Sequence, residues 1–345
     1  MSKLKVLDIF CGAGGMSQGF IDAGFDVALG LDLSHDAIAT FKKNHIESIA
    51  CVSDLFKDTP ETILTSTGFG SFDVIIGGPP CQGFSIAGKR DINDERNQLY
   101  KSFVNFVNFF KPKAFVLENV PNILTMGNGL IKENIIIDFE AIGYKVQCKV
   151  LTASDYGVPQ TRRRAFFVGI VDDVFRFPAV STLNPITSYE AISDLPEHSL
   201  QSGEYYPSEP LSEYQQIMRQ GSDGVYNHTT TKHTDKTKQI ISLVPDGGNY
   251  KNLPKEFKCT RNVNIAWTRL NSNRPSFTID TGHRHHFHYA FPRVPTVREA
   301  ARIQSFKDNF IFLGSQTTQN RLVGNAVPPL LAKAIALQLK EFLNV

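Results

Sequence analysis

The stretch KVLDIFCGAGGMSQGFIDAG, residues 5 to 24, reads as a strand, a glycine-rich turn and a helix in direct succession. KVLDIF is a mostly apolar run of strand length, and MSQGFIDAG has the apolar spacing of a helix. The glycines of CGAGG let the backbone of the turn approach a ligand closely. This order is typical of the first strand and helix of an α/β sheet with a ligand site at its edge.

The alternation of strand and helix continues along the first half of the chain. We predict strands at VALGLD (27–32), FDVII (72–76) and AFVLENV (114–120), and helices after Ser34 and at QLYKSFVNFVNFFKP, which Pro112 ends. FEAIGYKVQCKVL and RRRAFFVGI add a last helix and strands. The predicted fold class is therefore α/β with a parallel, doubly wound sheet.

A change of composition after Val171 predicts a second domain. Residues 172 to about 295 are rich in Ser, Thr, Asn, Pro and His, and their periodicity is weak. Helical order returns at TVREAARIQSF (296–306) and at VPPLLAKAIALQLKEFL, which has proline in its first turn. We expect one domain from residues 1–171 plus 318–345, and a loop-rich second domain with its hinge from residues 172–317.

Composition argues against several classes of protein. The 345 residues are 41% hydrophobic, which suffices for a core, and no run comes near the roughly 18 apolar residues of a membrane span. The chain starts with a strand rather than a signal peptide, and its five cysteines (11, 51, 81, 148 and 259) form no CxxC pair. We expect a reduced, cytoplasmic protein without membrane contact.

The distribution of charge is more informative than the net charge of +2. Between His228 and Arg274, nine Lys or Arg stand against three acids. This stretch is either a solvated surface or a patch that faces phosphates.

Two acids follow the glycine-rich turn at spacings that suit a nucleotide. Asp32 lies 20 residues beyond Gly12 at the end of the second strand, where an acid typically accepts hydrogen bonds from ribose hydroxyls. Asp54 of SDLF either closes the adenine side of the same site or is a helix N-cap or turn residue. A dinucleotide and S-adenosylmethionine both remain open as ligands, although the turn lacks the spaced GxGxxG that places a pyrophosphate on a helix N-terminus.

A cysteine stands in an unusual place in GGPPCQGFS, residues 77 to 85. Two glycines and two prolines end the preceding strand and form a stiff turn. Cys81 is thereby held outside the carboxyl end of the strand, where ligands bind in open α/β sheets. It is either a half-buried structural thiol or a reactive one.

Eight stretches together resemble the cytosine-C5 DNA methyltransferases of the prokaryotic restriction–modification type. They are DIFCGAGG, LDLS, SDLF, GGPPCQGFS, LENV, QTRRR, REAARIQSF and GNAVPP, in the family's order from residue 6 to about 340. The resemblance implies a Rossmann-like, S-adenosylmethionine-dependent methyltransferase fold with a doubly wound mixed sheet. It also implies a smaller, loop-rich target-recognition domain inserted before the C-terminal helix.

The resemblance assigns catalytic roles to four residues. Cys81 matches the nucleophile that adds to cytosine carbon 6, because carbon 5 accepts a methyl group only after such covalent activation. Glu118 of LENV matches the acid that holds and protonates N3. Arg162 and Arg164 match the arginines of the Gln-x-Arg-x-Arg motif that starts at Gln160, and on one strand both would point to the same face, toward the base carbonyl and the thiolate.

The resemblance also implies S-adenosylmethionine as the cofactor, S-adenosylhomocysteine as its product, and no metal. Asp32 stands where the family usually has Glu. The cofactor-binding residues it implies are Phe10, Gly12, Gly14, Gly15, Asp32, Leu33, Asp54, Leu55, Pro79, Asn325 and Val327.

For DNA, the resemblance implies that the target cytosine is flipped out of the duplex. The polar loop of residues 82 to about 98 is expected to close over the DNA, and the basic stretch of the second domain to anchor phosphates. Four histidines in TGHRHHFHY (283, 285, 286 and 288) are more consistent with packing or DNA contact than with a metal site, and Trp267 with core packing. The expected DNA-binding residues are Gln82, Ser85, Lys89, Arg90, Arg96, Arg261 and Arg269.

Several rival functions stay open at the level of sequence. They are a tRNA cytosine-C5 methyltransferase of the same family, a catalytically inactive DNA-binding regulator, an amino-methylating enzyme and, least favoured, an NAD-dependent oxidoreductase. We expect a monomer that acts on double-stranded DNA. A restriction endonuclease is expected as a functional counterpart without stable contact.

Overall fold

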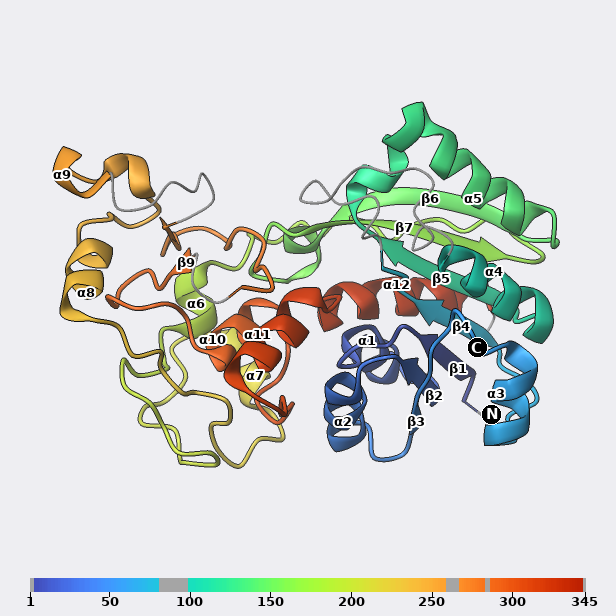
Figure 1. Cartoon of the computed structure of the whole chain (residues 1–345), viewed down its shortest axis with the longest axis horizontal. Coiled ribbons are helices and arrows are strands. Elements are labelled where there is room, and N and C mark those ends of the chain that lie inside the picture. The colour runs from blue at the N-terminus through green and yellow to red at the C-terminus, as the bar shows by residue number, and fades with distance from the viewer. Residues whose placement is uncertain (1–2, 81–98, 259–266, 283–285, 344–345) are drawn as a thin grey trace. The chain divides into compact units, whose positions relative to one another are not determined.

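The structure is a computed structural model that describes residues 3–80, 99–258, 267–282 and 286–343 of the chain (Figure 1). The chain forms two compact units. The first unit comprises Met1–Thr152, Arg163–Val180 and Pro329–Val345, and the second comprises Ala153–Arg162 and Ser181–Pro328.

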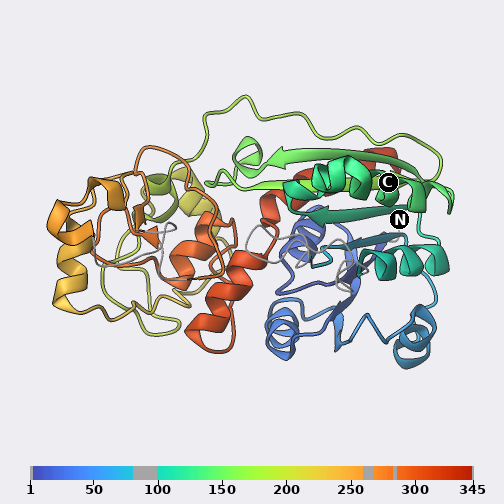
Figure 2. The same cartoon turned by 45° about the horizontal axis from the view of Figure 1, so that its top comes forward.

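The first unit contains a seven-stranded sheet in the order β3-β2-β1-β4-β5-β7-β6 (Figures 1 and 2). Strands β1 to β5 pair in parallel, whereas β7 pairs antiparallel with both β5 and β6. The α/β fold with a mixed, doubly wound sheet confirms the fold class that the resemblance implies. It corrects the all-parallel sheet expected from alternation, because β6 and β7 follow each other without a crossover helix and pair antiparallel. The strands are β1 Lys5–Ile9, β2 Asp26–Asp32, β3 Ile49–Val52, β4 Val74–Gly77, β5 Ala114–Asn119, β6 Lys145–Thr152 and β7 Arg163–Ile170.

Helices of the first unit follow the strands as the sequence pattern indicates, with two differences: the helix expected from Phe139 onward lies earlier, at Leu130–Glu140, and one short helix is additional. The short helix α3 was not predicted; it starts at Pro60, and Thr59 and Thr62 form a reciprocal capping box at its N-terminus. The helices are α1 Gly15–Asp22, α2 His35–Asn44, α3 Pro60–Thr67, α4 Leu99–Phe110, α5 Leu130–Glu140 and α12 Pro329–Phe342, with 3-10 turns η3 Pro121–Leu124 and η4 Met126–Gly129.

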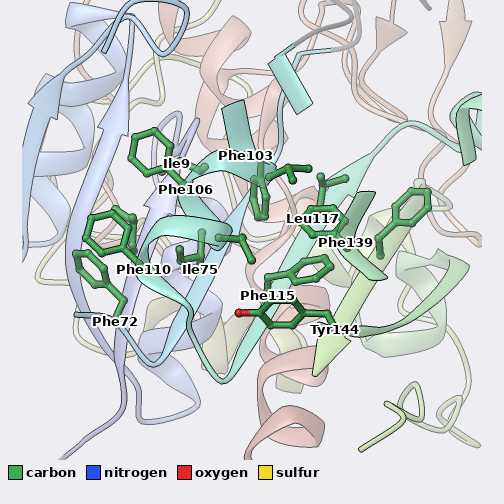
Figure 3. Close-up of a cluster of buried hydrophobic side chains, with 14 of the residues drawn as sticks. Ile9, Phe72, Ile75, Phe103, Phe106, Phe110, Phe115, Leu117, Phe139 and Tyr144 are labelled. Carbon is green, nitrogen blue, oxygen red and sulfur yellow. The ribbon is translucent and has the colours of Figure 1, made fainter. Parts of the chain in front are cut away.

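Phenylalanines dominate the core on one face of this sheet (Figure 3). Phe103, Phe106 and Phe110 recur at helical spacing, so one face of α4 presents three rings to the sheet. Phe115 of β5 stacks on Phe139 of α5 with ring centroids 3.9 Å apart. Each such buried side chain contributes about 1.5–3 kcal/mol, and together they fix the strand ends that carry the site.

The second unit is rich in loops, as its composition predicts. Its helices are short, and β8 and β9 form a two-residue parallel pair (Figure 2). The elements are η5 Ala153–Tyr156, α6 Ser188–Ile192, α7 Glu213–Arg219, α8 Asp235–Ser242, η6 Tyr250–Asn252, α9 Lys255–Lys258, β8 Thr268–Arg269, β9 His286–Phe287, α10 Val297–Ile303 and α11 Gln316–Asn325.

Buried charges stabilise the centre of the second unit. Arg302 of α10 pairs with Asp308 at 2.7 Å and also with Asp194, and all three side chains are fully buried. Arg293 makes two 2.7 Å hydrogen bonds to the carboxylate of Glu299. Buried ion pairs persist only when their remaining donors are satisfied, so this centre tolerates little rearrangement.

The borders between the units differ from those expected from composition. Residues 153–162 join the second unit, where Gln160 bridges to Ser276, and residues 172–180 stay with the first, where Phe175 packs on Phe342. The first unit resumes at Pro329 rather than at residue 318, because α11 packs against α10.

One apolar run corrects the expectation about membrane spans. Residues 316–342 are long and apolar enough to cross a membrane by length and composition. However, 61% of the apolar window is buried inside the protein, and α11 and α12 are separate elements. Buried core helices pass the same test, so the run is weak evidence for a span.

Candidate active site

The turn that precedes Cys81 is fixed between the carboxyl ends of β4 and β5. A Cβ at Gly78 would lie 2.8 Å from Oε2 of Glu118, so a side chain there would require the Glu118 carboxylate to shift. The side-chain amide of Asn119 donates to the carbonyl of Pro79 at 3.1 Å. Cys81 itself lies outside the described residues, but the rigid turn that leads into it packs directly against Glu118.

Glu118 and Arg164 form an ion pair beside this turn. Nε of Arg164 lies 2.8 Å from Oε1 of Glu118, and the two side chains keep 15% and 12% of their surface exposed. Residue 118 of β5 pairs with residue 166 of β7, and Arg164 shares a face with that partner because strand side chains alternate. Burial lowers the pKa of Arg164, and the charge of Glu118 opposes that shift. The structure thus brings together two of the four predicted catalytic residues.

Arg162 is placed differently from the prediction. Strand β7 begins at Arg163, so Arg162 precedes the strand instead of alternating with Arg164 on it. Its buried guanidinium donates to the carbonyls of Ile279 at 3.2 Å and of Gly324 at 2.8 Å, both in the second unit. The condition that both arginines lie on one strand is therefore not met by Arg162, which here hydrogen-bonds to two main-chain carbonyls.

The glycine-rich turn after β1 has the backbone geometry that its glycines allow. Gly12 and Gly14 adopt φ of 56° and 93°, and Phe10 is also left-handed at 63°. The N–H groups of Gly12 and Ser34 donate to the two carboxylate oxygens of Asp32 at 2.9 and 2.8 Å. Asp32 thereby clamps the turn, and each oxygen keeps a further lone pair for a ligand hydroxyl. Burial raises the pKa of Asp32, and these two N–H donors oppose that shift.

The remaining residues expected at the cofactor site divide into accessible and buried ones. Leu33 is 63% exposed, Gly15 begins α1, and Pro79 is buried under Asn119. Asp54 pairs with Lys57 at 3.0 Å, and this contact lowers the pKa of the carboxyl.

Leu55, Asn325 and Val327, which were all expected at the cofactor site, differ in how exposed their side chains are. The side chain of Leu55 belongs to the phenylalanine-rich core, and its carbonyl accepts from the Ser102 hydroxyl at 2.7 Å. Any ligand contact of Leu55 would therefore use its backbone. In the second unit, Asn325 is exposed at the end of α11 and Val327 is buried.

Two residues beside the turn were not singled out from sequence. Asp8 of β1 is 1% exposed, accepts a 2.5 Å hydrogen bond from Ser17 of α1, and has its pKa raised to about 7 by burial. The buried ring of His45 lies where a Cβ at Gly14 would come within 2.2 Å of Nε2. An acid inside an apolar strand was a signal that could have identified Asp8, whereas nothing local marks His45.

Arg269 corrects an expectation about DNA contacts. Its side chain is 7% exposed and donates to the carbonyls of Ile241 at 2.6 Å and of Tyr289 at 3.2 Å. Because the guanidinium of Arg269 is buried and already donates to main-chain carbonyls, it is poorly placed to reach a phosphate. Gln82, Ser85, Lys89, Arg90, Arg96 and Arg261 lie outside the described residues, so their DNA contacts stay predictions.

The histidine-rich segment and its neighbour are packed. His288 is fully buried, its ring stacks on that of Phe291 at 4.5 Å, and its Nδ1 accepts from the N–H groups of Ala290 and Phe291. His286 contacts the ring of Phe277, and Trp267 packs on the cluster that contains Phe287, as expected. Residues 283 and 285 lie outside the described part of the chain, and within that part no three His, Cys, Asp or Glu gather as metal ligands.

Comparisons with known proteins agree with this geometry. A sequence model of the family described as C-5 cytosine-specific DNA methylase matches residues 4–341. The chain is 38% identical to the Type II methyltransferase M1.HphI of Haemophilus parahaemolyticus over 97% of this chain and 86% of that one. It is 37% identical to M.DdeI of Desulfomicrobium norvegicum over 96% and 88%. A prophage-encoded protein of E. coli, described as a DNA modification methyltransferase, superposes with a TM-score of 0.81 at 28% identity over 99% of this chain and 100% of that one.

Proposed function

The chain belongs to the C-5 cytosine-specific DNA methylase family, and from that premise we propose which of its residues carry the methyl transfer. It is a DNA (cytosine-5-)-methyltransferase, and its substrate is DNA. One observation supports the assignment of residues above the others: the turn that leads into Cys81 packs against the ion pair of Glu118 and Arg164.

In the proposed reaction, Cys81 adds as a thiolate to carbon 6 of a flipped cytosine, which makes carbon 5 nucleophilic. Glu118 holds a proton at N3, so that negative charge does not build up on the ring. Arg164 fixes the orientation of the Glu118 carboxyl from the neighbouring strand. Once carbon 5 carries the methyl group, a base removes the proton from carbon 5, the C5–C6 double bond re-forms and the C6–S bond breaks, which releases the Cys81 thiolate.

The residues around the turn after β1 fit S-adenosylmethionine, which the family uses generally. When bound, this cofactor supplies the methyl group for carbon 5. The left-handed backbone at Gly12 and Gly14 allows close approach, Asp32 offers oxygens to ribose hydroxyls, and the exposed side chain of Leu33 offers an apolar wall. We assign Asn325 and Val327 to the same cofactor by their motif.

The second unit is proposed to recognise the target sequence. It carries exposed cations that suit phosphates: Lys232, Lys236, Lys238, Lys251, Lys255 and Arg274. The DNA contacts expected of residues 82–98 lie outside the described residues and stay predictions.

We further propose a role in restriction–modification, as a cytoplasmic monomer that protects host DNA against an endonuclease with which it makes no stable contact. The names of the Type II relatives support this role. The role predicts that DNA carrying the modified site resists one restriction endonuclease.

Labelled S-adenosylmethionine, unmethylated genomic DNA and the full chain test the proposal directly. We expect labelled DNA and, after bisulfite sequencing, protected cytosines in one short context. A parallel reaction with tRNA is expected to stay unlabelled. Tight DNA binding without transfer would overturn the proposed chemistry in favour of an inactive regulator, and labelled tRNA alone would assign the RNA substrate instead.

A further inference from the structure

Three buried polar side chains of the second unit form one hydrogen-bonded network that the proposed chemistry leaves unexplained. Gln160 and Gln304 are 0% exposed and Arg162 is 1% exposed. They come from QTRRR and REAARIQSF, two of the motifs that mark the family in the sequence. Burying three polar side chains is unfavourable unless each finds partners, so their partners indicate their purpose.

Gln304 holds the turn that follows α11. Its amide nitrogen donates to the carbonyl of Ala326 at 2.7 Å and to that of Val323 at 3.2 Å. Two carbonyl oxygens at this position can be faced only by the nitrogen of the amide, so the orientation of the amide is fixed. The bonds span Asn325, the residue at the end of α11.

Gln160 fixes the position of the Gln304 side-chain amide. Its amide nitrogen donates to the side-chain oxygen of Gln304 and, at 3.3 Å, to the carbonyl of Ile303. Its own oxygen accepts from the N–H of Ile279 at 3.0 Å. The side-chain amides of Gln160 and Gln304 therefore each have one orientation. Main-chain groups set it: the N–H of Ile279 for Gln160, and the carbonyls of Val323 and Ala326 for Gln304.

Arg162 also holds the Val323–Val327 turn by hydrogen bonds. Arg162 donates to the carbonyl of Gly324 at 2.8 Å and to that of Ile279 at 3.2 Å. A Cβ on Gly324 would lie 2.2 Å from the carbonyl oxygen of Asp280, so the turn and the segment at 279–281 are in direct contact. The Val323–Val327 turn thus has one position, defined by segments far apart in sequence.

We propose that Gln304 is a positioning residue for cofactor binding: it sets the Val323–Val327 turn in the geometry that lets Asn325 and Val327 contact S-adenosylmethionine. The inference rests on the proposed role of those two residues. Gln304 touches neither cofactor nor base, and acts through the turn. Preorganised turns bind ligands more tightly because no ordering is required on binding.

The test measures steady-state methyl transfer by full-length Gln304→Met, which keeps the side-chain size and removes the donor. We expect KM for S-adenosylmethionine to rise by about tenfold to a hundredfold, because two buried carbonyls lose their donor and the turn relaxes. At saturating cofactor, kcat is expected to stay within about threefold of the original value. DNA affinity is expected to be unchanged.

Gln215→Met is the matched control. Gln215 is also 0% exposed in the second unit, donates to the Ser193 hydroxyl at 2.9 Å and accepts from the N–H of Leu211 at 2.6 Å. Among the described residues, its side chain bonds to 189, 193 and 211 and not to the turn at 323–327. Gln215→Met removes a buried amide comparable to that of Gln304 but does not affect the turn at 323–327. KM for the cofactor is therefore expected to stay unchanged. Fluorescence of Trp267, the single tryptophan, reports whether the second unit is folded in each variant.

The outcomes separate this inference from the proposed function. A raised KM in Asn325→Ala together with an unchanged KM in Gln304→Met overturns the positioning role and leaves the proposed function intact. An unchanged KM in Asn325→Ala removes the cofactor role of the turn, and the inference fails with it. If Gln304→Met does not fold, Gln160→Met replaces it: a rise of about threefold or more is expected, and no rise overturns the inference.

Discussion

Two clusters of this chain use the same chemical pair, an arginine and an acid, to different ends. Beside the turn into Cys81, Arg164 and Glu118 keep 15% and 12% of their side-chain surface exposed. Around α10, Arg302 lies between Asp194 and Asp308, and all three side chains are fully buried. The pair proposed to meet the substrate is partly accessible, whereas the buried charges around α10 are removed from water because each has its partners.

The contrast predicts that changes in the first cluster abolish chemistry without unfolding the protein, and that changes in the second unfold it. Because Trp267 is the single tryptophan and belongs to the second unit, its fluorescence follows that unit alone, while far-UV circular dichroism follows both. Stability and activity can therefore be assigned to one region each.

The largest effect is expected for Cys81→Ser. A serine hydroxyl without a partner base is a poor nucleophile, so methyl transfer should fall by at least about a thousandfold. Binding of DNA and cofactor, and the unfolding midpoint, should not change. Substantial turnover by this variant would refute covalent catalysis through residue 81.

Glu118→Gln should come next, with a loss of about a hundredfold to ten-thousandfold in kcat. Glutamine keeps the shape that packs against Gly78 but cannot transfer a proton to N3. Cofactor affinity, measured by calorimetry, should stay within about twofold. An unchanged rate would place protonation of N3 elsewhere.

Arg302→Met tests the buried cluster. It leaves Asp194 and Asp308 without their shared cation, and we expect the second unit to lose about 3–5 kcal/mol of unfolding free energy in urea, read from Trp267 fluorescence. Lys101→Met, in the first unit, is the control and is followed by far-UV circular dichroism. The pair of Lys101 with Asp138 is half exposed and should contribute less than about 1 kcal/mol. Equal losses in both variants would contradict the comparison.

The smallest effect concerns pH and lies in the first unit. Burial raises the pKa of Asp8 to about 7 from 3.8, so between these values the folded protein binds more protons at Asp8 than the unfolded chain does. Stability contributed by this group therefore falls as pH rises from about 4 to 7. Because Asn cannot titrate, the unfolding free energy of Asp8→Asn should rise relative to that of the unmodified protein between about pH 4 and 7. Above about pH 7 the difference should level off.

Urea unfolding at several pH values, followed by circular dichroism, measures this difference. Asp36→Asn, which changes an exposed aspartate of α2, is the control and should run parallel to the original protein. A flat difference for Asp8→Asn between pH 4 and 7 would mean that Asp8 is charged in the folded protein.

Much of the fold could be predicted from the sequence, because strand and helix periodicity is local. Strands β1, β2, β4 and β5 lie within a residue or two of the predicted runs. The edge strand β3 was missed: only one of its four residues is fully buried, so its apolar signal is weak. Helix α3 was missed because it depends on a cap and a proline more than on an apolar face.

The candidate site was predicted in part. Glu118 lies at the end of an apolar strand and Gly12 precedes a helix, so both were located by position as well as by motif. The contacts of Arg162 could not be predicted, because its partners Ile279 and Gly324 lie 117 and 162 residues away in the sequence. Arg269 was misassigned because sequence shows the charge of an arginine and not its burial.

By itself, the sequence determined the chemistry available to this protein and the order in which its motifs occur, since those depend on residue types and short spacings. Only the tertiary structure decided which charged and polar groups are withdrawn from water. Gln160 meets Gln304 across 144 residues, and Arg302 meets Asp194 across 108. Burial is a property of such distant contacts, and no local pattern specifies them; the same residue type is therefore a substrate contact at one place and a structural tie at another.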